Sequence, residues 1–143
     1  MKSATIGLVA GVSSMLLLAA CQTTGGTSGG TQAPAAAKVP LDVDFSWAGT
    51  TACTSKPPAF VVKGAPEGTT RLRFRMTDLD APAYHHGGGT VAYSGATEIP
   101  AGAFSYTGPC PPTGSHDYRW LVQALNADGT VVGEGTVTRS FPP

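Results

Sequence analysis

The chain has 143 residues, and its nine basic side chains are balanced by nine acidic ones. This balance leaves no strongly basic surface, which argues against a nucleic-acid partner. Charged residues make up 13% of the chain, about half the usual share, and 19 glycines with 12 prolines interrupt it too often for long helices. The composition therefore favours a small domain built from short elements.

The first segment resembles a bacterial lipoprotein signal. Lys2 is followed by an uncharged apolar run at residues 4–18, which ends in the small residues that precede Cys21. A transmembrane anchor is the weaker alternative, because about 20 apolar residues are needed to cross a bilayer. We expect residues 1–20 to be removed as a signal peptide and Cys21 to be acylated, with palmitate or a similar chain, so that it anchors the protein to a membrane. Because Gln22 stands where an aspartate typically retains such proteins at the inner membrane, the outer membrane, facing the periplasm, is the expected location.

A polar segment separates this anchor from the rest of the chain. Residues 22–40 contain no aromatic side chain, and Lys38 is their only charged residue. Such a segment cannot bury enough apolar surface to fold. Residues 21–40 are therefore predicted to be the lipidated cysteine with a flexible linker, and residues 41–143 one small domain.

Alternation of apolar and polar residues predicts the strands of this domain. Strand patterns occur at residues 41–47, 60–63, 71–76, 90–93, 116–125, 131–132 and 136–138. The clearest places Leu72, Phe74 and Met76 on one face and three arginines, at 71, 73 and 75, on a solvated face. Residues 126–129, with Asp-Gly at the end, have the chemistry of a hairpin turn. We predict an all-β fold, an antiparallel β-sandwich in a single small domain with long loops rich in glycine and proline.

Two cysteines remain after Cys21 is assigned to the lipid. Cys53 and Cys110 would pair in an oxidising compartment. A disulfide closing a loop of this length stabilises a fold by roughly 4 kcal/mol. A metal site or a reactive thiol is the alternative, but two distant single cysteines lack the usual zinc spacing.

Two segments carry the polar residues best suited to a site. They are T-D-L-D-A-P at residues 77–82 and G-P-C-P-P-T-G-S-H-D-Y at residues 108–118. Together they resemble the phosphatidylethanolamine-binding protein family, especially its bacterial Raf-kinase-inhibitor-like branch, which carries D-P-D-A-P and G-P-C-P-P-x-G-x-H-R-Y elements. Leu79 and Asp117 replace the proline and the arginine of these elements, and the domain is shorter than is usual in the family.

The resemblance implies a β-sandwich whose pocket binds phosphate-type anions and phospholipid head groups. The residues that it implies as ligand-binding are Asp78, His85, His86, Pro112, His116 and Tyr118. From the residues alone, His116 and Tyr118 share one face of a strand and can both donate to an oxyanion, while Asp78 can fix an imidazole or bind an ammonium group. Each also has a purely structural interpretation: Asp78 in a turn, the histidine pair in a mobile loop, and His116 with Tyr118 as ordinary strand residues.

The expected function is a membrane-tethered binding module for a small anionic or zwitterionic ligand, possibly a phospholipid head group, with no catalytic residue, cofactor or metal. One alternative is a structural or interaction lipoprotein of the envelope whose pocket is vestigial. A metal-dependent hydrolase using His85, His86, His116 and Asp78 is a third, although no recognised ligand spacing supports it. A Ser-His-Asp triad is disfavoured because Ser115, His116 and Asp117 are adjacent in sequence.

Overall fold

The computed structural model describes residues 37–143. The predicted signal peptide, Cys21 and most of the predicted linker lie outside the described residues. Eight strands and no helix occur in the described part: β1 (Val39–Pro40), β2 (Asp42–Phe45), β3 (Phe60–Lys63), β4 (Arg71–Asp78), β5 (His85–Ala92), β6 (Glu98–Ile99), β7 (His116–Leu125) and β8 (Val131–Phe141). Accordingly, residues 37–143 include no apolar helix of membrane-spanning length.

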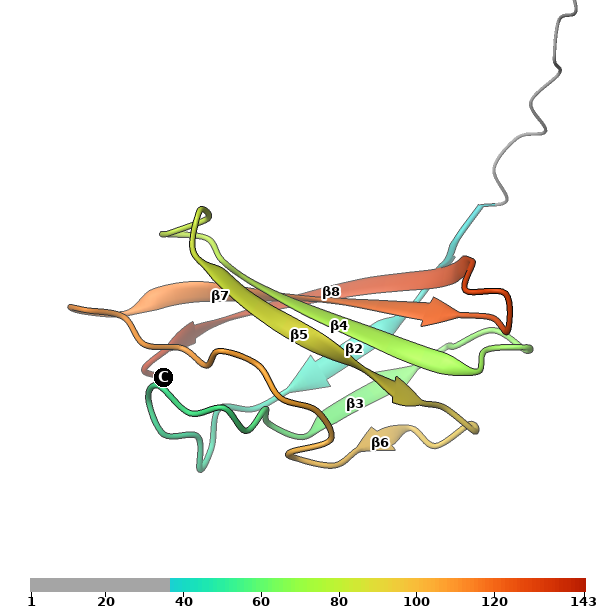
Figure 1. Ribbon diagram of the computed structural model, residues 1–143, viewed down its shortest axis with the longest axis horizontal. Helices are drawn as coiled ribbons and strands as arrows, with labels where there is room; N and C mark the ends of the chain where they lie inside the picture. Colours follow the sequence, from blue (N-terminus) through green and yellow to red (C-terminus); the bar gives the residue numbers. More distant parts are fainter. Residues whose placement is uncertain (1–36) are drawn as a thin grey trace, which may run out of the picture. The chain divides into compact units, whose positions relative to one another are not determined.

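The strands form two sheets, which Figure 1 shows one above the other. The larger sheet has the order β1-β8-β7-β4-β5 and the smaller one the order β2-β3-β6. All pairs are antiparallel except β1 with β8, which is parallel. The predicted all-β class is confirmed, and the larger sheet is mixed only at its β1 edge.

The core lies between the two sheets and is rich in aromatic rings. Alternation along β4 buries Leu72, Phe74 and Met76 and leaves the arginines exposed, as predicted. Phe60 of the smaller sheet contacts two rings of the larger one, Phe74 at 4.8 Å and Trp120 at 5.1 Å between centroids. Aromatic pairs at these distances contribute about 0.5–1.5 kcal/mol beyond the burial of their area.

Several elements are longer than their sequence pattern indicates, or lie outside it. β4 continues two residues beyond the predicted segment, to Asp78, and β6 has no counterpart among the predicted strands. β5 begins at His85 rather than at residue 90, because its glycines carry no side chains that could show alternation. β8 is one continuous strand, since Gly133 and Gly135 are close to Leu41 and leave no room for the side chains that would complete the pattern. β1 comprises the last two residues of the segment predicted as linker, which pair with Gly133 and Glu134.

The predicted hairpin turn is present between β7 and β8. The N–H of Asn126 donates to the carbonyl of Thr130 at 3.1 Å, and the N–H of Gly129 donates to the carbonyl of Asn126 at 3.1 Å. Gly129 has a φ of +83°, the left-handed region in which Asp-Gly turns place their glycine. This turn sets the register of the two longest strands.

Candidate functional site

Asp78 is the last residue of β4, and its side chain faces the core because the alternation of buried and exposed residues continues to the end of that strand. Its side chain points the same way as Leu72, Phe74 and Met76, and only 4% of the residue is exposed. Its Oδ1 accepts the backbone N–H groups of Asp80 at 2.9 Å and Ala81 at 3.0 Å. The turn interpretation of Asp78 is therefore correct, but it uses only one of the two carboxylate oxygens.

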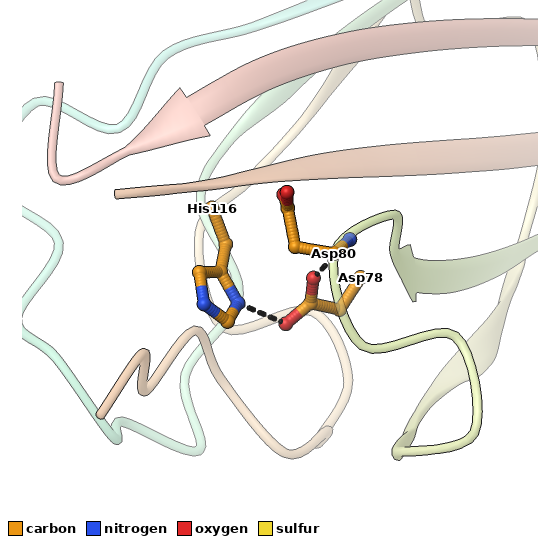
Figure 2. Close-up of side chains that lie close together, drawn as sticks. All are labelled: Asp78, Asp80 and His116. Atoms are coloured by element: carbon orange, nitrogen blue, oxygen red, sulfur yellow. Dashed lines mark hydrogen bonds and ion pairs between the residues drawn. The ribbon is translucent and has the colours of Figure 1, made fainter. Parts of the chain in front are cut away.

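The second oxygen of Asp78 binds the imidazole of His116. Nδ1 of His116, at the start of β7, lies 2.7 Å from Oδ2 of Asp78 (Figure 2). This hydrogen bond is the main reason that the pKa of His116 is raised; burial opposes it in part, and the negative charges of Asp78 and Asp80 add smaller increases. Burial would raise the pKa of Asp78, but hydrogen bonds from His116, Asp80 and Ala81 outweigh it and hold the pKa below its usual value. The result is an ion pair at the end of the core.

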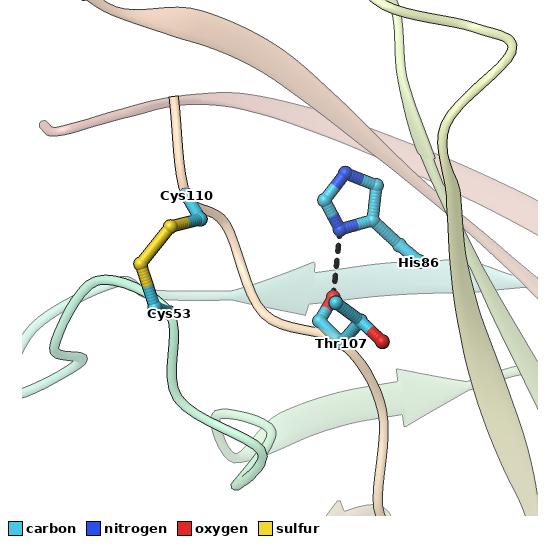
Figure 3. Close-up of a disulfide and its surroundings, with 4 residues drawn as sticks. All are labelled: Cys53, His86, Thr107 and Cys110. Carbon is cyan, nitrogen blue, oxygen red and sulfur yellow. Dashed lines mark hydrogen bonds between the residues drawn. A yellow bond between two sulfur atoms is a disulfide. The ribbon is translucent and has the colours of Figure 1, made fainter. Parts of the chain in front are cut away.

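His86 approaches the same carboxylate from β5. Its ring is buried, at 2% exposure, and its Nδ1 lies 2.7 Å from the carbonyl oxygen of Thr107 (Figure 3). Because a carbonyl oxygen only accepts, Nδ1 carries the proton in this pair. Its Nε2 has no hydrogen-bond partner among the described residues and lies 3.9 Å from Oδ2 of Asp78. The free nitrogen therefore faces the carboxylate at a distance too long for a hydrogen bond.

Tyr118 completes the cluster from the middle strand of the sheet. It pairs directly with Asp78 across β4 and β7, and its side chain is fully buried. The ring of His86 meets it edge-on at 5.4 Å, and the ring of His116 stacks at 6.2 Å. Its hydroxyl makes no hydrogen bond of good geometry in residues 37–143, although it lies near enough to the carboxylate of Asp78 and the backbone of Cys110 for both to affect its pKa. Burial, and then the charge of Asp78, raise the pKa of Tyr118 to about 12, so the hydroxyl keeps its proton as a donor.

Two of the predicted site residues lie elsewhere. His85 is exposed and pairs with Thr77, so that it faces away from the cluster. Pro112 is exposed in the loop before β7 and takes no part in the hydrogen bonds and ring contacts that join the other four. Four of the six predicted residues thus come together, namely Asp78, His86, His116 and Tyr118.

The loop that leads to His116 is fixed to the rest of the domain by the predicted disulfide. Cys53 and Cys110 are bonded, with their Cα atoms 4.6 Å apart (Figure 3). Backbone hydrogen bonds reinforce this link, from Cys53 N–H to the carbonyl of Pro109 and from Gly108 N–H to the carbonyl of Thr54, both at 2.8 Å. A Cβ at Gly108 would collide with that Thr54 carbonyl, so glycine is required for the close approach.

The cluster is better explained by hydrogen bonding than by metal binding. Asp78, Asp80 and His116 each have one ligand-type atom within 4.8 Å of the others. The 2.7 Å contact of His116 with Asp78 is that of a charge-assisted hydrogen bond, and Oδ2 of Asp80 accepts the N–H of Asp117 at 2.7 Å. The sequence also suggested a metal-binding set of His85, His86, His116 and Asp78. His85 lies on the other face of β5 and cannot share a metal ion with the other three.

Three residues outside the six predicted ligand-binding positions also shape the site. Thr107 orients His86 through its backbone carbonyl, and Tyr84, which is 55% exposed, lies 4.8 Å from the His86 ring between centroids. Trp47 packs edge-on against Tyr118 at 6.1 Å. A backbone carbonyl leaves no mark in the sequence, and the three glycines at residues 87–89 hide the alternation that would have shown which histidine of the pair faces inward.

Comparison with solved structures finds similar chains, two of which are described next. A phosphatidylethanolamine-binding protein homologue from Chlamydia trachomatis is 15% identical, with 74% of this chain and 98% of that chain covered and a TM-score of 0.49. YbcL of Escherichia coli, described as a new member of the mammalian phosphatidylethanolamine-binding protein family, is 17% identical, with 73% and 98% covered and a TM-score of 0.49. The chain resembles these proteins. Neither a protein-family model nor a curated protein matches the sequence.

Proposed function

We propose that this protein is a membrane-tethered binding module whose ligand is a small anionic or zwitterionic molecule of the phosphate type, such as a phospholipid head group. The ligand binds at the cluster of Asp78, His86, His116 and Tyr118. The tether is an acyl chain on Cys21, and the domain faces the periplasm from the outer membrane.

The observation that carries this proposal is a pair of buried polar atoms without partners. Nε2 of His86 and Oη of Tyr118 are both inaccessible to solvent and unbonded among the described residues. An unsatisfied buried polar group costs about 1–3 kcal/mol. Two such groups beside one carboxylate suggest that a ligand or ordered water completes the hydrogen bonds.

The donors present match an oxyanion. Tyr118 supplies a hydroxyl that stays protonated, because its pKa is about 12. His116 donates through Nδ1 to Asp78, and its raised pKa favours the cation, which adds an Nε2–H donor on a ring that is 18% exposed. The Asp78 carboxylate, in turn, accepts from an ammonium group or from a protonated phosphate oxygen. A ligand with both an oxyanion and a donor would therefore satisfy all four side chains.

The test is a titration of the full chain, purified in detergent, with phosphoethanolamine. Isothermal calorimetry and amide chemical shifts should show saturable binding, with the shifts centred on residues 78, 86, 116 and 118. His116→Ala and Asp78→Asn should abolish it. His85→Gln is the matched control, since it alters the neighbouring imidazole on the opposite face and should leave the affinity unchanged.

The absence of any saturable change in the wild-type protein would refute the proposal. Equal loss of binding in His85→Gln and His86→Gln would also refute the assigned site. Acylation is tested separately, by the mass of the mature protein and by its release from membranes in Cys21→Ser.

A further inference from the structure

A hollow lies on the outer face of the larger sheet, over the β4–β5 hairpin. Its volume is about 610 Å³, within the roughly 300–1,000 Å³ typical of ligand sites. Its lining includes the outward-facing side chains of Arg73, Arg75, Thr77, His85 and Thr90, together with Tyr84 and His86. Because successive strand residues point to opposite faces, the arginines point away from Asp78, and His86 is the one residue that belongs both to this lining and to the Asp78 cluster.

A β-bulge gives the hollow a bare floor. Met76 of β4 lies opposite two residues of β5, His86 and Gly87, an arrangement that leaves one residue outside the ladder. Gly87 and the following glycines line the hollow with backbone alone. Gly88 has a φ of +150°, and a Cβ there would collide with the carbonyl of Phe74. Side chains are thus excluded from the floor, which keeps the hollow open.

The hollow carries positive charge without a compensating acid. No acidic side chain of the described residues lines it. In residues 37–143 the side chain of Arg75 has no hydrogen-bond or ion-pair partner. Arg73 donates to Oε1 of Gln123 through Nε at 3.0 Å and Nη2 at 2.6 Å. These two bonds fix its guanidinium and leave its remaining N–H groups available.

The spacing of the two arginines indicates the class of ligand. They are two residues apart on one face of β4, so their Cα atoms are roughly 7 Å apart. Guanidinium groups bind phosphate and carboxylate oxygens in pairs, and two at this spacing favour an anion with more than one charged group. An anion bound between them also relieves their mutual repulsion. A planar membrane surface fits less well, because it cannot enter the hollow.

We propose that the hollow bounded by Arg73, Arg75, Thr77 and His85 is a second binding site, which takes a small soluble polyanion such as a chain of linked phosphates. The four residues that bound the site are distinct from those of the Asp78 cluster, although His86 also lines the hollow, and the proposal does not depend on the function of that cluster.

Titration of the full chain in detergent with inorganic tripolyphosphate, at low ionic strength, tests this site. Calorimetry should show saturable binding, and amide shifts should move at residues 73–77 and 85–90. Arg75→Gln should weaken the affinity at least tenfold, as expected for loss of a charge-assisted hydrogen bond. Arg71→Gln is the matched control. It removes the same charge from the same strand face but lies outside the hollow, and it should change the affinity less than about threefold by loss of general electrostatic attraction alone.

Four results would overturn the proposal, three with tripolyphosphate and one with vesicles. One is an absence of saturable binding, and another is equal weakening by Arg71→Gln and Arg75→Gln, which would indicate a diffuse electrostatic effect. The third is loss of tripolyphosphate binding in Tyr118→Phe, which would place the anion in the inner cluster. Vesicles of phosphatidylglycerol serve as the comparison. Binding to them that exceeds binding to tripolyphosphate, and that is lost in Arg75→Gln, would assign this face to a membrane instead.

Discussion

Replacing Tyr118 by phenylalanine should separate stability from binding. The change removes only the hydroxyl, which is buried and has no hydrogen-bond partner among residues 37–143. Leaving a buried polar group unpaired costs about 1–3 kcal/mol. We therefore expect the free energy of unfolding without ligand to stay equal or to rise by about 1 kcal/mol, which corresponds to roughly 4–8 °C in a domain of this size.

The same change should weaken binding of phosphoethanolamine. A hydrogen bond to a charged group contributes about 1.5–3 kcal/mol, so the affinity should fall by roughly 10- to 150-fold. Urea unfolding measures the first quantity and calorimetric titration the second. Tyr106→Phe is the matched control, because its hydroxyl is also buried without a partner while its ring packs against Trp120. It should stabilise similarly and keep the affinity.

A loss of more than about 1 kcal/mol of stability in Tyr118→Phe would refute this reasoning. It would mean that the hydroxyl already makes a favourable hydrogen bond, for example to the neighbouring carboxylate of Asp78, and does not await a ligand.

Three further predictions concern stability. The pKa of His116 is raised and that of Asp78 is lowered, so the stabilisation by their pair is fully present between their ordinary pKa values, about 4 and 6.5. His116→Gln should therefore lower the free energy of unfolding most in this pH range, as measured by urea unfolding across pH. The difference should shrink as pH rises through the folded pKa of His116 or falls through that of Asp78. A constant difference from pH 4 to 9 would contradict this. Replacing both Cys53 and Cys110 by serine should lower the free energy of unfolding by up to about 4 kcal/mol, as measured in guanidinium, and a loss below 1 kcal/mol would show that the loops hold without the bond. Gly88→Ala should destabilise the fold by more than about 2 kcal/mol, because the new Cβ would meet the Phe74 carbonyl. Gly95→Ala is the control: there is open space at its Cβ, so it should cost only about 1 kcal/mol for its φ of +99°. Equal shifts of the melting temperature in the two variants would refute the argument.

Local alternation was sufficient to predict the regular strands. Residues 60–63 and 116–125 form strands at the predicted positions, and residues 71–76 form most of β4. In these segments the apolar side chains point to one core, so that the pattern in the sequence is also the pattern of burial. Where glycine occupies the strand, as at Gly88 and Gly89 and at Gly133 and Gly135, the contact that requires glycine lies in a distant segment and leaves no local pattern.

The site was predictable in its chemistry but not in its details. The spacing of His116 and Tyr118 put both side chains on the inner face, and Asp78 follows from the alternation of β4. Which histidine of the pair faces inward depended on the start of β5, and the orientation of His86 depends on the carbonyl of Thr107, 21 residues away. Such pairings come from the topology of the sheet and not from any local property of the sequence.

The short β1 strand has a consequence for self-association. β8 is the longest strand, and part of its outer edge would be open if the chain began at residue 41. Val39 and Pro40 cover that edge at Gly133 and Glu134, and farther along it Arg139 bonds Asp44 of β2. Unprotected edges invite pairing with another molecule. Val39 and Pro40 therefore protect this edge of the sheet from pairing with a strand of another molecule. A protein that begins at residue 41 should aggregate sooner than one that retains these two residues.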